Sequence, residues 1–125
     1  MCIEQVEIER FLVRKNIQSL GDQCLSLDFF SDGHDCLRLL ESNPPTNETV
    51  ILVNLRLGGP GLCGFEFVTA FEDISVAVRE KCAIVMMMLS DTEEYYQQVE
   101  APPSVAGILV KPISPIALAQ ILKTL

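Results

Sequence analysis

The chain has 125 residues, of which 49% are hydrophobic and 21% are charged, and its net charge at pH 7 is -8. This length predicts one domain, residues 1–125, that buries roughly two thirds of its unfolded surface. The negative charge disfavours nucleic-acid binding, and no apolar run approaches the roughly 18 residues that a membrane span requires.

Helices and strands are predicted to alternate along the whole sequence. Helical spacing of apolar residues, capping residues and proline breaks indicate the helices, and short apolar runs indicate the strands. In chain order the pattern predicts a very short or incomplete strand at 1–3, a helix at 8–20 closed by Gly21, and a strand at 24–30. It then predicts a helix from an N-cap at Ser31 or Asp32 to the break at Asn43, a strand at 49–55 and a helix at 65–81. The last elements are a strand at 82–89, a polar helix at 90–100, a strand at 105–110 and a helix from the N-cap Ser114 to Leu125. This alternation implies an α/β fold, a doubly wound three-layer sandwich around a parallel sheet.

Several kinds of site are disfavoured by the sequence. Five widely spaced cysteines form no C-x-x-C pair and have one histidine to help them bind metal, so we expect reduced, mostly buried thiols. No G-x-G-x-x-G fingerprint follows a strand, which argues against a nucleotide site. The acidic start MCIEQVEIER does not read as a signal peptide, so we expect a cytoplasmic protein.

Four segments, in their order along the chain, resemble parts of one family. The segments are VILVNLR at 50–56, GFEFVTAF at 64–71, IVMMM at 84–88 and GILVKPIS at 107–114. Together they resemble the receiver domain of bacterial two-component response regulators, over essentially the whole chain. The resemblance implies a flavodoxin-like five-stranded sheet of order 2-1-3-4-5, and a cis peptide bond between Lys111 and Pro112.

The chemistry of an active receiver can be matched to this sequence residue by residue. Two acids after the first strand and an acceptor aspartate after the third form an oxygen cage for Mg²⁺. A lysine and a hydroxyl group then hold the acyl phosphate. By the resemblance, the acidic pair falls on Glu4 and Gln5, the acceptor on Asn54, the hydroxyl on Met88 and the lysine on Lys111.

The replaced residues imply a receiver that has lost its phosphoacceptor chemistry. The amide of Asn54 cannot form a mixed anhydride, and with Gln5 it lowers the negative charge offered to a divalent ion from about three to one. Met88 cannot donate a hydrogen bond to a phosphoryl oxygen, although an alignment shifted by two residues places Ser90 there instead. We therefore expect no catalytic residue, no enzyme activity, and weak or absent Mg²⁺ binding.

The leading hypothesis is a pseudo-receiver that acts as a protein-interaction module in two-component signalling or a phosphorelay. A histidine kinase or another signalling protein would bind through the region 92–125. One alternative is a working phosphoacceptor that uses another acid such as Asp91, or a deamidated Asn54, although the bulky Leu55 slows deamidation. Another is a small flavodoxin-like enzyme or ligand-binding protein. The structural alternatives are that Asn54 only caps a strand and that Lys111 is a structural lysine paired with Glu4 or Asn54.

The short first strand raises a separate question about the centre of the sheet. Central parallel strands run roughly five residues, and each unpaired buried backbone group costs on the order of 1–3 kcal/mol. We expect Met1 to Gln5 to pair on both sides as a minimal strand, with a tendency to form a homodimer. Strand exchange with a second copy, and a native start upstream of Met1, are the alternatives.

Overall fold

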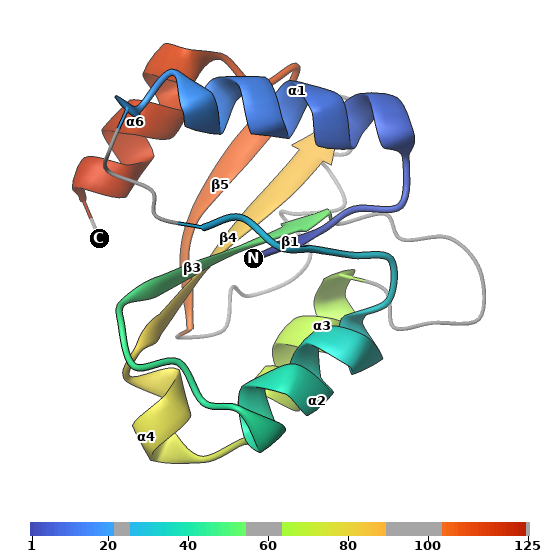
Figure 1. The fold of residues 1–125 in the computed structure, drawn as a ribbon, viewed down its shortest axis with the longest axis vertical. Helices are drawn as coiled ribbons and strands as arrows, with labels where there is room; N and C mark the ends of the chain where they lie inside the picture. The colour runs from blue at the N-terminus through green and yellow to red at the C-terminus, as the bar shows by residue number, and fades with distance from the viewer. Residues whose placement is uncertain (22–25, 55–63, 90–103, 125) are drawn as a thin grey trace.

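The computed structural model describes residues 1–21, 26–54, 64–89 and 104–124, and helices and strands alternate along them (Figure 1). The elements are β1 (Cys2–Ile3), α1 (Glu7–Gln18), β2 (Phe29–Phe30), α2 (Gly33–Ser42), β3 (Thr49–Asn54), α3 (Gly64–Phe71), α4 (Val76–Arg79), β4 (Cys82–Leu89), β5 (Val105–Lys111) and α6 (Pro115–Lys123). The predicted polar helix at 90–100 lies outside the described residues.

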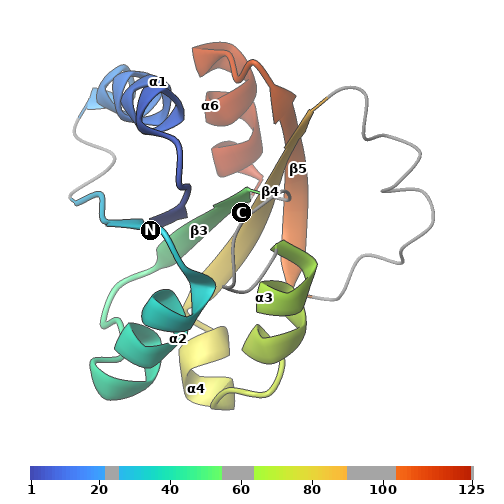
Figure 2. The ribbon, with the colours of Figure 1, turned by 90° about the vertical axis from the view of Figure 1, so that its right-hand side faces the viewer.

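The strands form one parallel sheet of order β2-β1-β3-β4-β5. Helices α1 and α6 lie on one face, and α2, α3 and α4 lie on the other (Figures 1 and 2). The predicted three-layer α/β sandwich and the strand order 2-1-3-4-5 are therefore confirmed.

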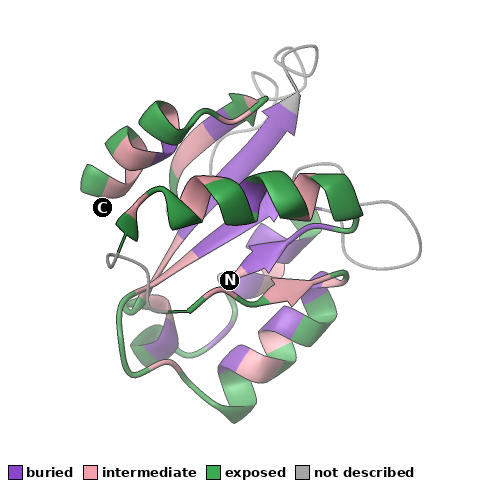
Figure 3. Cartoon of the chain, turned by 45° about the horizontal axis from the view of Figure 1, so that its top comes forward, coloured by how far each residue is buried: buried purple, intermediate pink, exposed green. Residues whose placement is uncertain are grey.

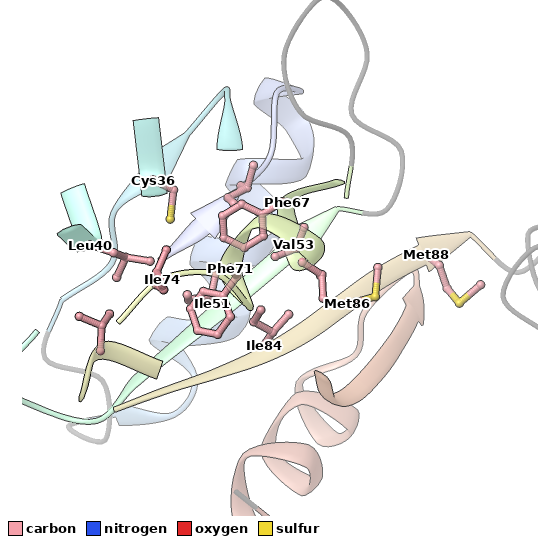
Figure 4. Packing of buried hydrophobic residues seen from close by; sticks show 13 residues of the cluster. Cys36, Leu40, Ile51, Val53, Phe67, Phe71, Ile74, Ile84, Met86 and Met88 are labelled. Carbon is pink, nitrogen blue, oxygen red and sulfur yellow. The ribbon is translucent and has the colours of Figure 1, made fainter. Parts of the chain in front are cut away.

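The core consists of two apolar layers, one on each face of the sheet. Along β3 the side chains alternate, so that Ile51 and Val53 face α2 and α3 while Leu52 faces α1 and α6. Figure 4 shows Ile51 and Val53 with Phe67 and Phe71 of α3 in the first of these layers. β3 and β4 are buried on both faces while the helices expose their outer sides (Figure 3), which explains the near-continuous apolar sequence of these two inner strands.

The first strand is as short as the sequence predicts, and it is paired on both sides. Its two residues are fully buried and align with β2 on one side and β3 on the other. Flanking backbone groups extend the pairing: the Glu4 amide donates to the Phe30 carbonyl at 3.0 Å, and the Leu52 amide donates to the Met1 carbonyl at 2.9 Å. The prediction of a minimal strand is confirmed.

Two predicted elements are shorter in the structure. Of the strand predicted at 24–30, residues 24 and 25 lie outside the described residues; within 26–30, β2 covers only Phe29 and Phe30, because its neighbour in the sheet is the two-residue β1. The helix predicted at 65–81 is divided into α3 and α4 by a turn that buries Ile74, and the Arg79 side chain donates to the Ile74 carbonyl at 3.0 Å. Burial of one apolar residue therefore interrupts a pattern that is helical in sequence.

The predicted helix ends are present. The Asp32 side chain accepts a hydrogen bond from the His34 amide, and the Ser114 hydroxyl accepts one from the Ala117 amide. Gly21 has a φ of +69°, the left-handed conformation that glycine adopts after a helix. The peptide bond between Lys111 and Pro112 is cis, as the resemblance implies.

Candidate functional site

Three predicted site residues meet at the carboxyl edge of the sheet. Glu4 directly follows β1, Asn54 ends β3, and Lys111 ends β5. Because the strands are parallel, these ends lie at the same edge, which is where open α/β sheets place their ligands. Each side chain is thus positioned by the end of a separate strand.

The carboxylate of Glu4 is the centre of the site and has no exposed surface. Its Oε1 accepts hydrogen bonds from the backbone amides of Gln5 at 3.0 Å and Val6 at 3.1 Å, and from Asn54 Nδ2 at 3.1 Å. Its Oε2 accepts from Lys111 Nζ at 3.0 Å. A buried charge is tolerated when it is both paired and hydrogen-bonded, and Glu4 has both kinds of partner.

Lys111 forms a second contact that sequence reasoning missed. Its ammonium lies 3.6 Å from Glu9 Oε2, and its side chain is only 9% exposed. Glu9 precedes the buried Val13 by four residues, so helical spacing places it on the inner side of α1 and is the signal that could have found it. The structural reading of Lys111 as the ion-pair partner of Glu4 agrees with this geometry.

Gln5 and Arg10 connect the site to the end of β2. The Gln5 side-chain amide donates to the Ser31 carbonyl at 3.1 Å. Arg10 Nε donates to the Glu4 carbonyl at 2.6 Å, while its Nη2 donates to the Ser31 hydroxyl at 2.8 Å. Sequence analysis predicted Gln5 as the second acid position but missed Arg10, since arginine has no part in the family's acidic cage.

Met88 is buried in the apolar layer between the sheet and α3, near the carboxyl end of β4 (Figure 4). In the sheet Asn54 aligns with Met87, so Met88 lies one residue further toward the edge that carries the site. A thioether there gives no hydrogen-bond donor. The alternative residue, Ser90, and the alternative acceptor, Asp91, lie outside the described residues.

The donor set around Glu4 does not fit Mg²⁺. Both carboxylate oxygens already accept from N–H groups, and one of the donors is a cation, which repels a second cation. Within the described ranges, no group of three or more His, Cys, Asp or Glu side chains is arranged to hold a metal. The Glu4 carboxylate is therefore already paired with a cation of the chain itself.

Two buried cysteines, Cys2 in β1 and Cys36 in α2, are not activated as nucleophiles. Burial, and secondarily the charge of Glu4, raise the pKa of the Cys2 thiol to about 12, and burial likewise raises the pKa of Cys36 to about 12. Because the thiolate is the reactive form, both residues are unreactive at neutral pH. Cys2, Cys36 and Cys82 are free thiols.

Across the described segments, no helix is both long enough and apolar enough to cross a membrane.

Comparison with solved structures of other proteins supports the fold. No protein-family model and no curated protein matches the chain. A response regulator receiver protein from Dyadobacter fermentans is 23% identical, with a TM-score of 0.80 over 98% of this chain and 92% of that one. A two-component response regulator from Cytophaga hutchinsonii is 18% identical, with a TM-score of 0.79 over 98% and 91%. The receiver domain of NtrX from Brucella abortus is 13% identical, with a TM-score of 0.72 over 98% and 92%. The chain has the fold of response-regulator receiver domains.

Proposed function

We propose that this receiver-fold chain is a protein-interaction module of two-component-type signalling that does not accept a phosphoryl group and is not an enzyme. The observation that carries the proposal is the contact between Asn54 and Glu4: the amide of Asn54, to which the family resemblance assigns the acceptor position, donates at 3.1 Å to the Glu4 carboxylate. An acceptor carboxylate at that point would be repelled by Glu4 rather than bound to it.

The electrostatics of the site support the same conclusion. In an acidic cage the carboxylates repel one another, and a divalent cation offsets that repulsion. Here Asn54 and Lys111 donate to Glu4, so the charge and the hydrogen-bond acceptors of the Glu4 carboxylate are satisfied without a bound metal. The proposal therefore includes weak or absent Mg²⁺ binding.

The proposed partner is a histidine kinase or another signalling protein that binds through the region 92–125. Within the described part of that region, Val110 on β5 is 51% exposed and Ile116 on α6 is 71% exposed. Exposed aliphatic side chains on a strand and the following helix are suited to contact another protein. The net charge of -8 favours a protein partner over nucleic acid.

A cytoplasmic location and a single domain over residues 1–125 complete the proposal. The free thiols of Cys2, Cys36 and Cys82 support the location, because reduced cysteines are typical of that compartment.

Intact-mass spectrometry of the full chain, after incubation with acetyl phosphate and Mg²⁺, tests the proposal. We expect the wild-type mass to stay unchanged. The matched control rebuilds the three replaced groups in the same chain, as Gln5→Asp, Asn54→Asp and Met88→Thr combined, and should gain one phosphoryl group that hydroxylamine removes. A stoichiometric, hydroxylamine-sensitive adduct on the wild type would contradict the proposal, and its loss in Asp91→Asn would identify Asp91 as the acceptor.

A further inference from the structure

Helix α1 has apolar residues on two opposite sides. Its inner side packs Val13 and Ile17 against the sheet. On its outer side Ile8, Phe11 and Leu12 are 60%, 47% and 44% exposed. Residues spaced by three and four positions share one side of a helix, so these three side chains form a continuous apolar stripe. Figure 3 shows this outer side of α1 exposed along most of its length.

The stripe stays partly exposed in the folded chain. Single exposed apolar residues are ordinary on protein surfaces, but a contiguous group of large ones indicates an interaction surface. Among the described residues, the ammonium of Lys15 lies 5.4 Å from the centroid of the Phe11 ring. This lysine is exposed, so it can move aside when another surface approaches the ring.

The charges of α1 are ordered along its length. The acids Glu7 and Glu9 lie in its first turn, and the bases Arg14 and Lys15 lie toward its end. Counting Arg10, the helix carries three positive and two negative side chains, a net charge of +1, whereas the whole chain carries -8. Two copies that approach through α1 therefore bring together helices of net charge +1 and not the acidic groups that dominate the rest of the chain.

We propose that the outer side of α1 binds the same side of a second copy of this chain, with the two helices antiparallel around a two-fold axis between Phe11 and Leu12. With a rise of about 1.5 Å per residue, Glu7 lies about 7 Å before that axis and Lys15 about 5 Å beyond it. The antiparallel arrangement therefore places Glu7 of each copy beside Lys15 of the other. It also pairs the two Phe11 rings and packs each Ile8 on the aliphatic stem of a Lys15.

One helix pair makes a small interface. A stable complex buries roughly 800 Å² on each partner, more than a single pair of short helices supplies. The dimer is accordingly weak and forms at high protein concentration. This inference stands apart from the proposed function, since it involves neither Asn54 nor the region 92–125.

Sedimentation equilibrium of the full chain, from micromolar to millimolar concentration, tests the proposal. The wild type should pass from monomer to dimer, and Phe11→Glu should raise the dissociation constant by about tenfold or more. The matched control is Val76→Glu, which changes an equally exposed aliphatic residue on α4, at the other face of the sheet, and should leave the dissociation constant unchanged.

A charge exchange tests the antiparallel arrangement. Glu7→Lys and Lys15→Glu should each weaken the dimer, because each places like charges together, and the two changes combined should restore it. A chain that stays monomeric throughout, or a combined variant that fails to recover, overturns the proposal. A dimer whose dissociation constant does not change in Phe11→Glu also overturns the proposal. Strand exchange, or pairing through the region 92–125, would give that result. Thermal unfolding of every variant establishes that the fold is retained.

Discussion

Replacing Asn54 by aspartate converts a donor to the buried Glu4 carboxylate into a second negative charge. The hydrogen bond that is lost spans 3.1 Å and ends on a charged group; such bonds contribute roughly 1.5–3 kcal/mol. Two like charges about 4 Å apart repel by about 4 kcal/mol at an effective dielectric constant of about 20. The ammonium of Lys111 also attracts the new carboxylate, and water reaches the half-buried position, so we expect a net loss of about 2–4 kcal/mol.

That loss is a large part of the roughly 5–15 kcal/mol by which a domain is stable, so urea unfolding will resolve it. Adding Mg²⁺ should restore stability to Asn54→Asp, by about 3 kcal/mol when the ion is at about a hundred times its dissociation constant. The wild type should show no such gain. The matched control Asn54→Ala loses the hydrogen bond without adding a charge, and should be less destabilised and insensitive to Mg²⁺.

Two results would refute this reasoning. One is an Asn54→Asp variant as stable as the wild type without Mg²⁺, and the other is a wild type that Mg²⁺ stabilises equally. The same variant alone should also remain a poor phosphoacceptor, since Gln5 and Met88 are unchanged. If it accepted a phosphoryl group as fast as the variant with all three groups rebuilt, the loss of chemistry would rest on Asn54 alone.

Three further predictions concern stability. Lys111→Met leaves the Glu4 carboxylate buried without its cation and should cost about 3–5 kcal/mol in urea unfolding; a cost below about 1 kcal/mol, typical of exposed pairs, would contradict the buried pair. Gly107→Ala places a methyl group against Ile121 Cδ1 and 2.8 Å from Ile121 Cγ1 and should cost about 1–3 kcal/mol; a neutral effect would mean that the Ile121 side chain moves aside without cost. The pKa of Cys2 is raised from 9.0 to about 12. The stability that this raised pKa gives the folded protein is therefore complete below pH 9 and is lost as the pH rises toward 12. Between pH 8 and pH 10 the wild type should therefore lose about 1 kcal/mol more than Cys2→Ala, and equal losses would contradict a buried thiol.

Sequence patterns predicted the parts of the fold that depend on local residues. The apolar runs of β3 and β4, the caps at Asp32 and Ser114, and the alternation of elements all follow from residues adjacent in the chain. The meeting of Glu4, Asn54 and Lys111 followed from the family resemblance together with the parallel sheet. The fold features among these are confirmed because local propensity and long-range pairing favour the same structure.

The remaining features depend on contacts between distant residues. The length of β2 is limited by β1, and no property of the segment 24–30 itself reveals that limit. Burial of Ile74 divides α3 from α4 although the segment's own spacing is helical. The two backbone donors to Glu4, and the contacts of Arg10, arise from the path of the chain as it leaves β1, which residue types do not specify.

The two-residue β1 divides the sheet into parts that can open separately. β3 pairs with β4, and β4 pairs with β5, along most of their lengths, whereas in the described part of the sheet β2 pairs only with β1, at Cys2 and Ile3 and the backbone groups beside them. Elements held by few buried hydrogen bonds open at lower free energy than the rest of a protein, as separate cooperative units. Amides at the β1–β2 boundary should thus exchange with solvent deuterium well before those of β3 and β4. The side chains of Gln5 and Arg10 reach across that boundary to Ser31, directly after β2, so these contacts help to set how often the smaller unit separates from the larger.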